Sequence, residues 1–336
     1  TPLGGIMAVT GKTAEQLHYT SGAKQIKLKQ GESYLVTDGT VDGTSVTGTA
    51  DTAAVFGLYA WGQDDSISLF DTASQKWLGY SSGGGWWNPT PAGLSLSDDS
   101  LHLGARSVNT QNNTISASSM PSNMRREYVS GNDGAFRMLA GTFTGGFFNS
   151  FEQSYYTSGV YLKTGENGKL DVSESMGSAA NAANVRTAET EFTAETVAEA
   201  GANVYENGDA AIVVIGVSPT FSAGEGTDRI DLDLGAEQYE LAHNVAAKYP
   251  GKTVVVVKVS SPVGLKSLEE DANIGAILYQ PYAGEYEGLA LANLLFGKAN
   301  PSGHLVNTWY ADNNPLPEID QSIIHNGWSN EGVTLD

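Results

Sequence analysis

The pattern of apolar residues changes near residue 193, and this change constrains the fold more than any other feature of the chain. Before that point, short apolar runs alternate with turn residues and no long helical period occurs, which is typical of antiparallel β structure. After it, apolar runs alternate with amphipathic segments, which is the pattern of a parallel sheet with helical crossovers. The sequence therefore predicts two structural units of different class within 336 residues.

The second unit gives the sharper element predictions. Continuous apolar runs predict strands, and amphipathic segments predict the helices between them. The predicted strands span 211–215, 253–259 and 276–279, and the predicted helices span 236–248 and 287–296. Ligands of open α/β sheets bind at the carboxyl ends of the strands, so the loops that follow these strands are where a site is expected.

The first unit carries a weak internal repeat. The dipeptides Tyr34-Leu35, Trp77-Leu78 and Tyr161-Leu162 each follow an apolar run and precede a turn. Three imperfect copies indicate a threefold β architecture. The segments that carry the first and last copies resemble a fascin-type β-trefoil, and the resemblance covers about residues 24–192.

Charge and composition narrow the classes of partner. Lys and Arg number 18 against 38 Asp and Glu, for a net charge of −20. Such a surface repels phosphate backbones and anionic lipids, so we expect no nucleic-acid partner and no membrane partner. The absence of cysteine excludes disulfides, thiolate metal sites and cysteine nucleophiles. The Gly-, Thr-, Ser- and Asn-rich composition fits a secreted or cell-surface protein that acts on polysaccharides, although it does not fix the compartment.

The strongest candidate for a functional residue is Glu225, in the loop after the first predicted strand. It lies between two glycines and is followed by Asp228 and Arg229. Flanking glycines allow a close approach of the backbone to a ligand. A solvated turn with an incidental glutamate is the alternative, and the spacing alone favours that alternative.

Several ordered motifs surround this loop. In chain order they are Gly224–Arg229, Leu232–Leu234 with Gln238, Thr253–Val259, Ala283–Ala290, Leu294–Gly297 and Asn300–Leu305. Together they resemble the second domain of glycoside hydrolase family three, from about residue 192 to residue 320, and are most similar to the xylosidase-type branch.

That resemblance implies a function and a division of roles. Members of the family are retaining β-glycosidases built from a (β/α)8 barrel and an α/β sandwich, with the active site between the two. Glu225 falls at the position of the acid/base glutamate, and Asp228 and Arg229 match loop-ordering positions. The nucleophilic aspartate belongs to the barrel, which is absent here, as is the first strand of the sandwich. We therefore expect half of an active site, completed by a barrel in the same or a separate chain and inactive alone.

Three further residues have two interpretations each. Trp86 and Trp87 form either a platform on which a sugar stacks or part of an apolar core. His304 either lines the substrate site or is a turn residue. The histidines lack ligand spacing, so we expect no metal, and no motif predicts a cofactor. The functional alternatives are a carbohydrate-binding module, in which the first unit presents aromatic side chains to an oligo- or polysaccharide, and a purely structural insert.

The predicted fold class is α/β: a three-layer α/β/α sandwich with a mostly parallel but incomplete sheet, plus an all-β trefoil-like insert. Residues 1–23 and 193–320 are assigned to the sandwich and 24–176 to the insert. Residues 177–192 form a linker or the last trefoil strand, and 321–336 a C-terminal tail.

Overall fold

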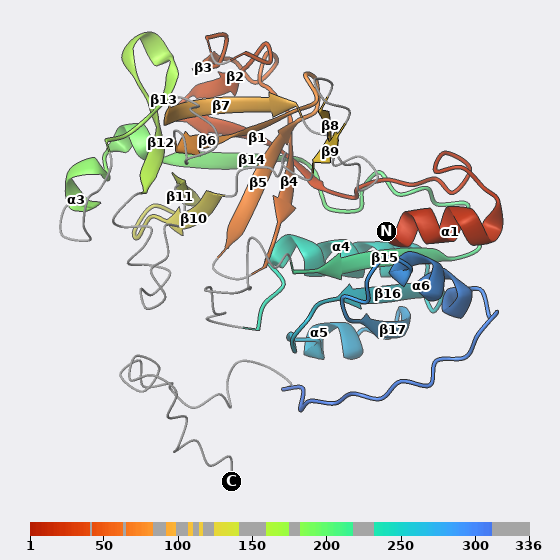
Figure 1. Cartoon of the computed structure of the whole chain (residues 1–336). Coiled ribbons are helices and arrows are strands. Elements are labelled where there is room, and N and C mark those ends of the chain that lie inside the picture. Colours follow the sequence, from red (N-terminus) through yellow and green to blue (C-terminus); the bar gives the residue numbers. More distant parts are fainter. Residues whose placement is uncertain are drawn as a thin grey trace.

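The computed structural model describes ten segments of the chain. They are residues 1–40, 42–62, 65–82, 92–98, 107–109, 114–116, 124–140, 159–174, 182–217 and 232–310. Figure 1 shows a group of antiparallel strands beside a smaller unit of parallel strands and helices. No helix among these residues is long and apolar enough to cross a membrane.

Antiparallel strands make up most of this structure, and they belong to a 12-stranded sheet that closes on itself. Six strands pair in a ring, in the order β1, β4, β5, β10, β11, β14 and back to β1. Their bounds are Lys24–Gln30, Phe56–Ala60, Ser66–Asp71, Met124–Tyr128, Ala135–Ala140 and Phe192–Ala198. Closure pairs both edges of each strand and leaves a barrel filled with apolar side chains.

The other six strands form three hairpins that extend this barrel. They are β2 (Ser33–Val36) with β3 (Ser45–Gly48), β6 (Lys76–Ser82) with β7 (Ala92–Asp98), and β12 (Val160–Thr164) with β13 (Leu170–Val172). Each of the three repeated dipeptides lies on the first strand of a hairpin. Leu35, Leu78 and Leu162 are fully buried in the barrel core, which explains why an apolar residue recurs at these positions.

The remaining elements around the barrel are short. A separate ladder joins β8 to β9. The bounds of these elements are Ser107–Asn109 for β8, Thr114–Ser116 for β9, Glu166–Gly168 for η2, Ala182–Val185 for α3 and Ala188–Thr190 for η4.

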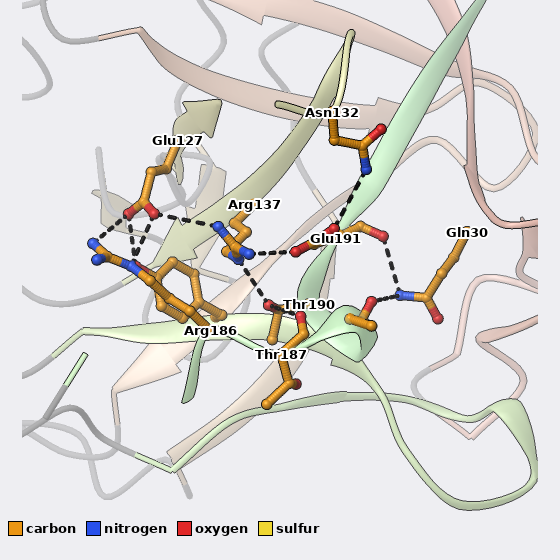
Figure 2. Close-up of polar contacts among 10 residues, drawn as sticks. Gln30, Glu127, Asn132, Arg137, Arg186, Thr187, Thr190 and Glu191 are labelled. Atoms are coloured by element: carbon orange, nitrogen blue, oxygen red, sulfur yellow. Dashed lines mark hydrogen bonds and ion pairs between the residues drawn. The ribbon is translucent and has the colours of Figure 1, made fainter. Parts of the chain in front are cut away.

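A charged network anchors the segment that precedes β14 to the barrel wall, as Figure 2 shows. Arg137 on β11 forms an ion pair with Glu191, and Arg186 Nε lies 2.9 Å from Glu127 Oε1 on β10. The hydroxyl of Tyr161 donates to Glu127 Oε2 at 2.7 Å. Burial and this hydrogen bond together raise the pKa of Tyr161 to about 12. The network therefore fixes the chain just before the strand that closes the barrel.

The second unit is a parallel sheet in the order β15, β16, β17. The strands span Ala211–Gly216, Thr253–Lys258 and Ile274–Gln280, and the helices α4, α5 and α6 span Ala236–Lys248, Lys266–Glu269 and Glu287–Leu295. The strands and helices predicted for this part of the chain are thus confirmed, with α4 at its predicted bounds. Ala242 and Val245 of α4 pack against alternate residues of β15 and β16, which forms the second apolar core.

The N-terminal helix α1 (Pro2–Thr10) packs against α6. A Cβ atom on Gly5 would overlap the backbone of Gly288, and one on Gly288 would overlap the backbone of Thr1. The two helices therefore cross in direct backbone contact, which only glycine at these positions permits.

The expected fold class is wrong for the chain as a whole. The structure is mostly antiparallel sheet around a closed six-stranded barrel, with few helices, and not a three-layer α/β/α sandwich with a parallel sheet. Twelve strands belong to the antiparallel sheet, whereas the parallel sheet has three. The expectation gave the main place to the α/β elements because their local patterns are clear, but most of the hydrogen-bonded strand pairs are antiparallel. The resemblance to a fascin-like trefoil and the division into domains stay predictions. β14, which spans the predicted boundary at 193, pairs with barrel strands β1 and β11.

Candidate functional site

A cleft of about 760 Å³ lies between the barrel and the carboxyl ends of β15 and β16. On the sheet side it is lined by Gly216, Val217 and Lys258, which end or follow these two strands. On the barrel side it is lined by residues of β1, β4 and β6. A concave site of this size at the carboxyl edge of a parallel sheet is typical of small-molecule binding in α/β proteins.

Gln238, in the first turn of α4, joins the two walls of the cleft. Its Nε2 lies 2.9 Å from the carbonyl oxygen of Gly216 and 3.0 Å from that of Ala60, the last residue of β4. Its Oε1 accepts from the backbone N–H of Gly216 at 2.7 Å. A side chain of the helix thus ties a barrel strand to the end of a parallel strand, and this fixes the spacing of the walls.

Tyr282 and Lys258 shape the sheet side of the cleft. The hydroxyl of Tyr282 donates to the carbonyl oxygen of Val217 at 2.5 Å. Lys258 Nζ lies 4.9 Å from the centroid of the Tyr282 ring, and it forms an ion pair with Glu287 Oε1 at 2.8 Å. The Tyr282 ring is therefore held in place at both its hydroxyl and its face.

Glu287 stays ionised in this arrangement. Burial raises the pKa of its carboxyl, but hydrogen bonds from Lys258 and from the backbone N–H of Ala283 lower it by more, so the pKa lies below the ordinary value. A carboxyl with a lowered pKa is a poor proton donor near neutral pH. Glu287 therefore serves to hold Lys258 and does not fit the role of a catalytic acid.

Aromatic side chains form the barrel wall. The rings of Tyr59 and Trp61 are stacked, with centroids 6.4 Å apart and planes at 21°. Tyr59 also meets Trp77 on β6 edge to face at 5.0 Å. Trp61 Nε1 donates to the hydroxyl of Ser68 at 2.9 Å, which fixes the orientation of its indole. The wall is thus a rigid surface of aromatic side chains.

The predicted catalytic loop begins and ends beside this cleft, although the loop itself lies outside the described residues. Glu225, Asp228 and Arg229 all fall within 218–231. The described chain stops at Val217 and resumes at residue 232. A Cβ atom on Gly62 would lie 2.9 Å from Val217 Cγ1 and 3.0 Å from the carbonyl oxygen of Asp233, so both ends come close to the same glycine.

The other predicted site residues fall elsewhere. Trp86 and Trp87 lie within 83–91, outside the described residues. His304 is exposed, in a stretch without helix or strand, and is absent from the described lining of the cleft. Its role stays a prediction. The described part of the chain brings no three His, Asp or Glu side chains together as ligands for a metal ion.

Sequence reasoning missed the polar and aromatic residues that line the cleft. Lys258 and Tyr282 could have been found from the rule that ligands bind where parallel strands end, because Lys258 lies at the end of one such strand and Tyr282 two residues after another. Gln238 belongs to a motif of the resemblance that implies no role for it. No sequence signal points to Tyr59 and Trp61, because they lie on β4 and just after it, in the other unit.

A cleft at the carboxyl edge of a parallel sheet, with an aromatic wall opposite, is thus formed where an α/β unit lies beside an antiparallel β-barrel. Residues 6–333 match the family model described as the glycosyl hydrolase family 3 C-terminal domain. The chain therefore belongs to this family and is a glycoside hydrolase family member.

Curated relatives are similar to shorter stretches of the chain. The β-D-xylosidase 3 of Arabidopsis thaliana is 38% identical over 102 residues, which is 30% of this chain and 13% of that protein. A β-xylosidase of Formosa agariphila is 39% identical over 113 residues, 33% of this chain and 15% of that protein. A β-xylosidase/α-L-arabinofuranosidase 1 of Medicago sativa subsp. varia is 33% identical over 109 residues, 32% of this chain and 14% of that protein. The chain thus spans a small part of the length of the relatives it matches.

Proposed function

We propose that this chain is part of a retaining β-glycosidase of the β-xylosidase type, in which Glu225 is the acid/base and an aspartate of a separate barrel domain is the nucleophile. The observation that carries the proposal is the position of the loop ends. Val217 directly follows a parallel strand at the cleft, and the chain resumes beside Gly62, which Val217 also approaches, so the loop with Glu225 starts and finishes at the carboxyl edge of the sheet. The xylosidase activity for which the similar proteins of Arabidopsis thaliana and Formosa agariphila are named supports the choice of sugar.

The proposed reaction has two steps. In the first, the aspartate attacks the anomeric carbon, the glycosidic C–O bond breaks, and Glu225 donates its proton to the leaving oxygen. In the second, the ionised Glu225 takes a proton from water, whose oxygen attacks the anomeric carbon and releases the aspartate. The two carboxyl groups must stand about 5–5.5 Å apart for this sequence. Because one of them lies on the other domain, we expect the chain alone to be inactive.

The substitution Glu225→Gln tests this role in the complete enzyme, which includes the proposed (β/α)8 barrel domain that carries the nucleophile. The test compares two substrates. The leaving group of xylobiose needs protonation, whereas the acidic phenol of an aryl β-xyloside leaves without it. We expect hydrolysis of xylobiose to slow about 10²- to 10⁴-fold, with a far smaller loss in the glycosylation rate of the aryl substrate. Equal losses on both substrates contradict the acid/base role.

Two further measurements control this experiment. Added azide should restore turnover of the aryl substrate by the Glu225→Gln enzyme, because azide attacks the covalent intermediate without a general base and gives a glycosyl azide of retained configuration. Glu166 is exposed on η2, near the β12–β13 hairpin, and Glu166→Gln should leave both substrates unaffected.

A further inference from the structure

We infer that the cleft between the β-barrel and the parallel sheet is itself a saccharide-binding site, which holds a neutral sugar unit against the aromatic wall formed by Tyr59 and Trp61. This assignment gives the β-barrel a direct part in substrate binding. The residues that form this site are distinct from Glu225 and its loop.

The shape and lining of the cleft suit a sugar. Its volume of about 760 Å³ lies within the range of small-ligand pockets and leaves room for more than one pyranose ring. The stacked rings of Tyr59 and Trp61 provide a fixed apolar surface for the C–H face of a sugar. The Tyr282 ring, 38% exposed and held by Val217 and Lys258, supplies a second aromatic surface on the sheet side.

The charges of the cleft favour a neutral ligand. The charged residues among its described lining are Lys24, Lys258 and Glu237, and each is already paired within the protein. Lys24 Nζ lies 2.7 Å from a carboxylate oxygen of Glu199, and Lys258 is bound to Glu287. Glu237 is bound to a buried arginine. A phosphate or carboxylate ligand would have to compete with these carboxylates, whereas a sugar hydroxyl has no charge to be neutralised.

Gln25 adds a polar group to the barrel side of this cleft. It lies on β1 and lines the cleft, and no hydrogen bond of its side-chain amide is found in the part of the chain that the structure describes. An amide both donates and accepts hydrogen bonds, as a sugar hydroxyl does, so the two are matched partners.

The experiment is calorimetric titration of the full chain with xylobiose and xylotriose. The choice of xylose units rests on the proposed function, and cellobiose and cellotriose form a second arm. We expect xylotriose to bind, Tyr59→Ala to weaken binding about tenfold or more, and Tyr59→Phe, which keeps the ring, to bind as the unsubstituted chain does. Tyr128→Ala is the matched control, because Tyr128 is 60% exposed on β10 and does not line the cleft.

The variant Gln25→Ala keeps the test decisive if Tyr59→Ala fails to fold. Gln25 is partly exposed, and its side chain bonds to no other residue among those that the structure describes, so its loss should weaken binding several-fold without lowering the melting temperature. The proposal is overturned if the folded chain binds neither oligosaccharide series at about 10 mM, or if binding persists unchanged in Tyr59→Ala and Gln25→Ala. Selective binding of the cello series would keep the site but reject the xylosidase assignment. The kinetics of Glu225→Gln do not depend on any of these outcomes, so the two proposals can fail separately.

Discussion

Arg126 on the barrel strand β10 and Glu237 in the first turn of α4 form a bidentate ion pair that joins the two units of the molecule. The two N···O distances are 2.6 and 3.1 Å. The side chains are 8% and 11% exposed, and Asp65 binds the same guanidinium. Burial lowers the pKa of Arg126, but the hydrogen bonds and charge of Glu237, together with Asp65, raise it by more, so the arginine remains charged.

Breaking this pair should strongly destabilise the chain. The variant Arg126→Met leaves Glu237 buried without its partner, for which we expect a loss of about 3 kcal/mol in the free energy of unfolding. The double variant Arg126→Met/Glu237→Met should lose less than the sum of the single variants, because it leaves no uncompensated charge. Urea unfolding of the four proteins gives the coupling energy between the two positions.

The exposed ion pair between Lys169 and Asp42 is the control for this comparison of single and double variants. Its side chains are 49% and 93% exposed at an N···O distance of 2.6 Å, so Lys169→Ala should leave unfolding unchanged. If the double variant loses as much as the two single variants together, then Arg126 and Glu237 are not coupled and the contact between the units is not held by this pair.

The α/β elements could be predicted because their signals are local. Helix α4 ends where Tyr249-Pro250-Gly251 follows it, and β16 contains four consecutive valines. Such signals depend on residues within a few positions of one another. For the barrel region, local patterns predict β structure with a threefold repeat. They do not predict which strands close the ring, because closure depends on β14 pairing with β1, far apart along the chain.

The cleft could not be predicted for the same reason. Gln238 looks like an ordinary residue of an amphipathic helix, and its function as a link becomes visible only when Ala60, 178 positions away, lies against it. Tyr59 on β4 and Trp61 just after it are two positions apart, as residues on one face of a strand are, and this spacing does not distinguish a wall of a cleft from a core. The role of Glu225 is predicted from the resemblance of its motif, and that prediction does not depend on how the two units meet.

The contact between helices α1 and α6 should be intolerant of any added side chain. Gly288→Ala places a methyl group where the carbonyl of Thr1 lies, so the helices must separate. We expect a loss of about 2–3 kcal/mol, as for other overpacked interiors, measured by urea unfolding. Gly303→Ala is the matched control, since a Cβ atom there meets no atom within 4 Å. Equal stability of the two variants would show that the helices do not approach this closely.

The pair formed by His243 on α4 and Asp271 before β17 should make stability depend on pH in the acid range. The Nδ1···Oδ2 distance is 2.7 Å. This hydrogen bond, with that from the backbone N–H of Asn273, lowers the pKa of Asp271 below its ordinary value of 3.8. Folding therefore favours the ionised carboxylate. The stabilisation is complete above the ordinary pKa and is lost as the pH falls through the lowered one.

The variant Asp271→Asn tests this dependence. It should be less stable than the unsubstituted chain at pH 6, and the difference should shrink as both proteins are taken below about pH 4. Thermal unfolding between pH 2.5 and 6 measures it. Asp209 is exposed, so Asp209→Asn serves as the control and should follow the unsubstituted chain throughout. A gap that widens toward low pH would contradict the lowered pKa of Asp271.

The hydrogen bonds of Gln238 should fix the positions of both walls of the cleft. The variant Gln238→Leu is similar in size but leaves the carbonyl oxygens of Ala60 and Gly216, and the N–H of Gly216, without this partner. We expect a loss of about 2–3 kcal/mol in the free energy of unfolding and faster hydrogen exchange at Gly216. Exchange should change little in α4 itself, because the backbone hydrogen bonds of the helix are untouched.

The outcome also bears on saccharide binding. If Gln238 sets the spacing between the aromatic wall and the sheet edge, Gln238→Leu should weaken xylotriose binding even though no direct contact with the sugar is proposed for it. Gln16→Leu is the control, because Gln16 is exposed and, within the described ranges, its side chain bonds only to the nearby Thr13. If exchange at Gly216 stays as slow as in the unsubstituted chain, then Gln238 does not set the spacing of the walls. The ion pairs of Arg126 and Lys24 with α4 would then hold the walls in place.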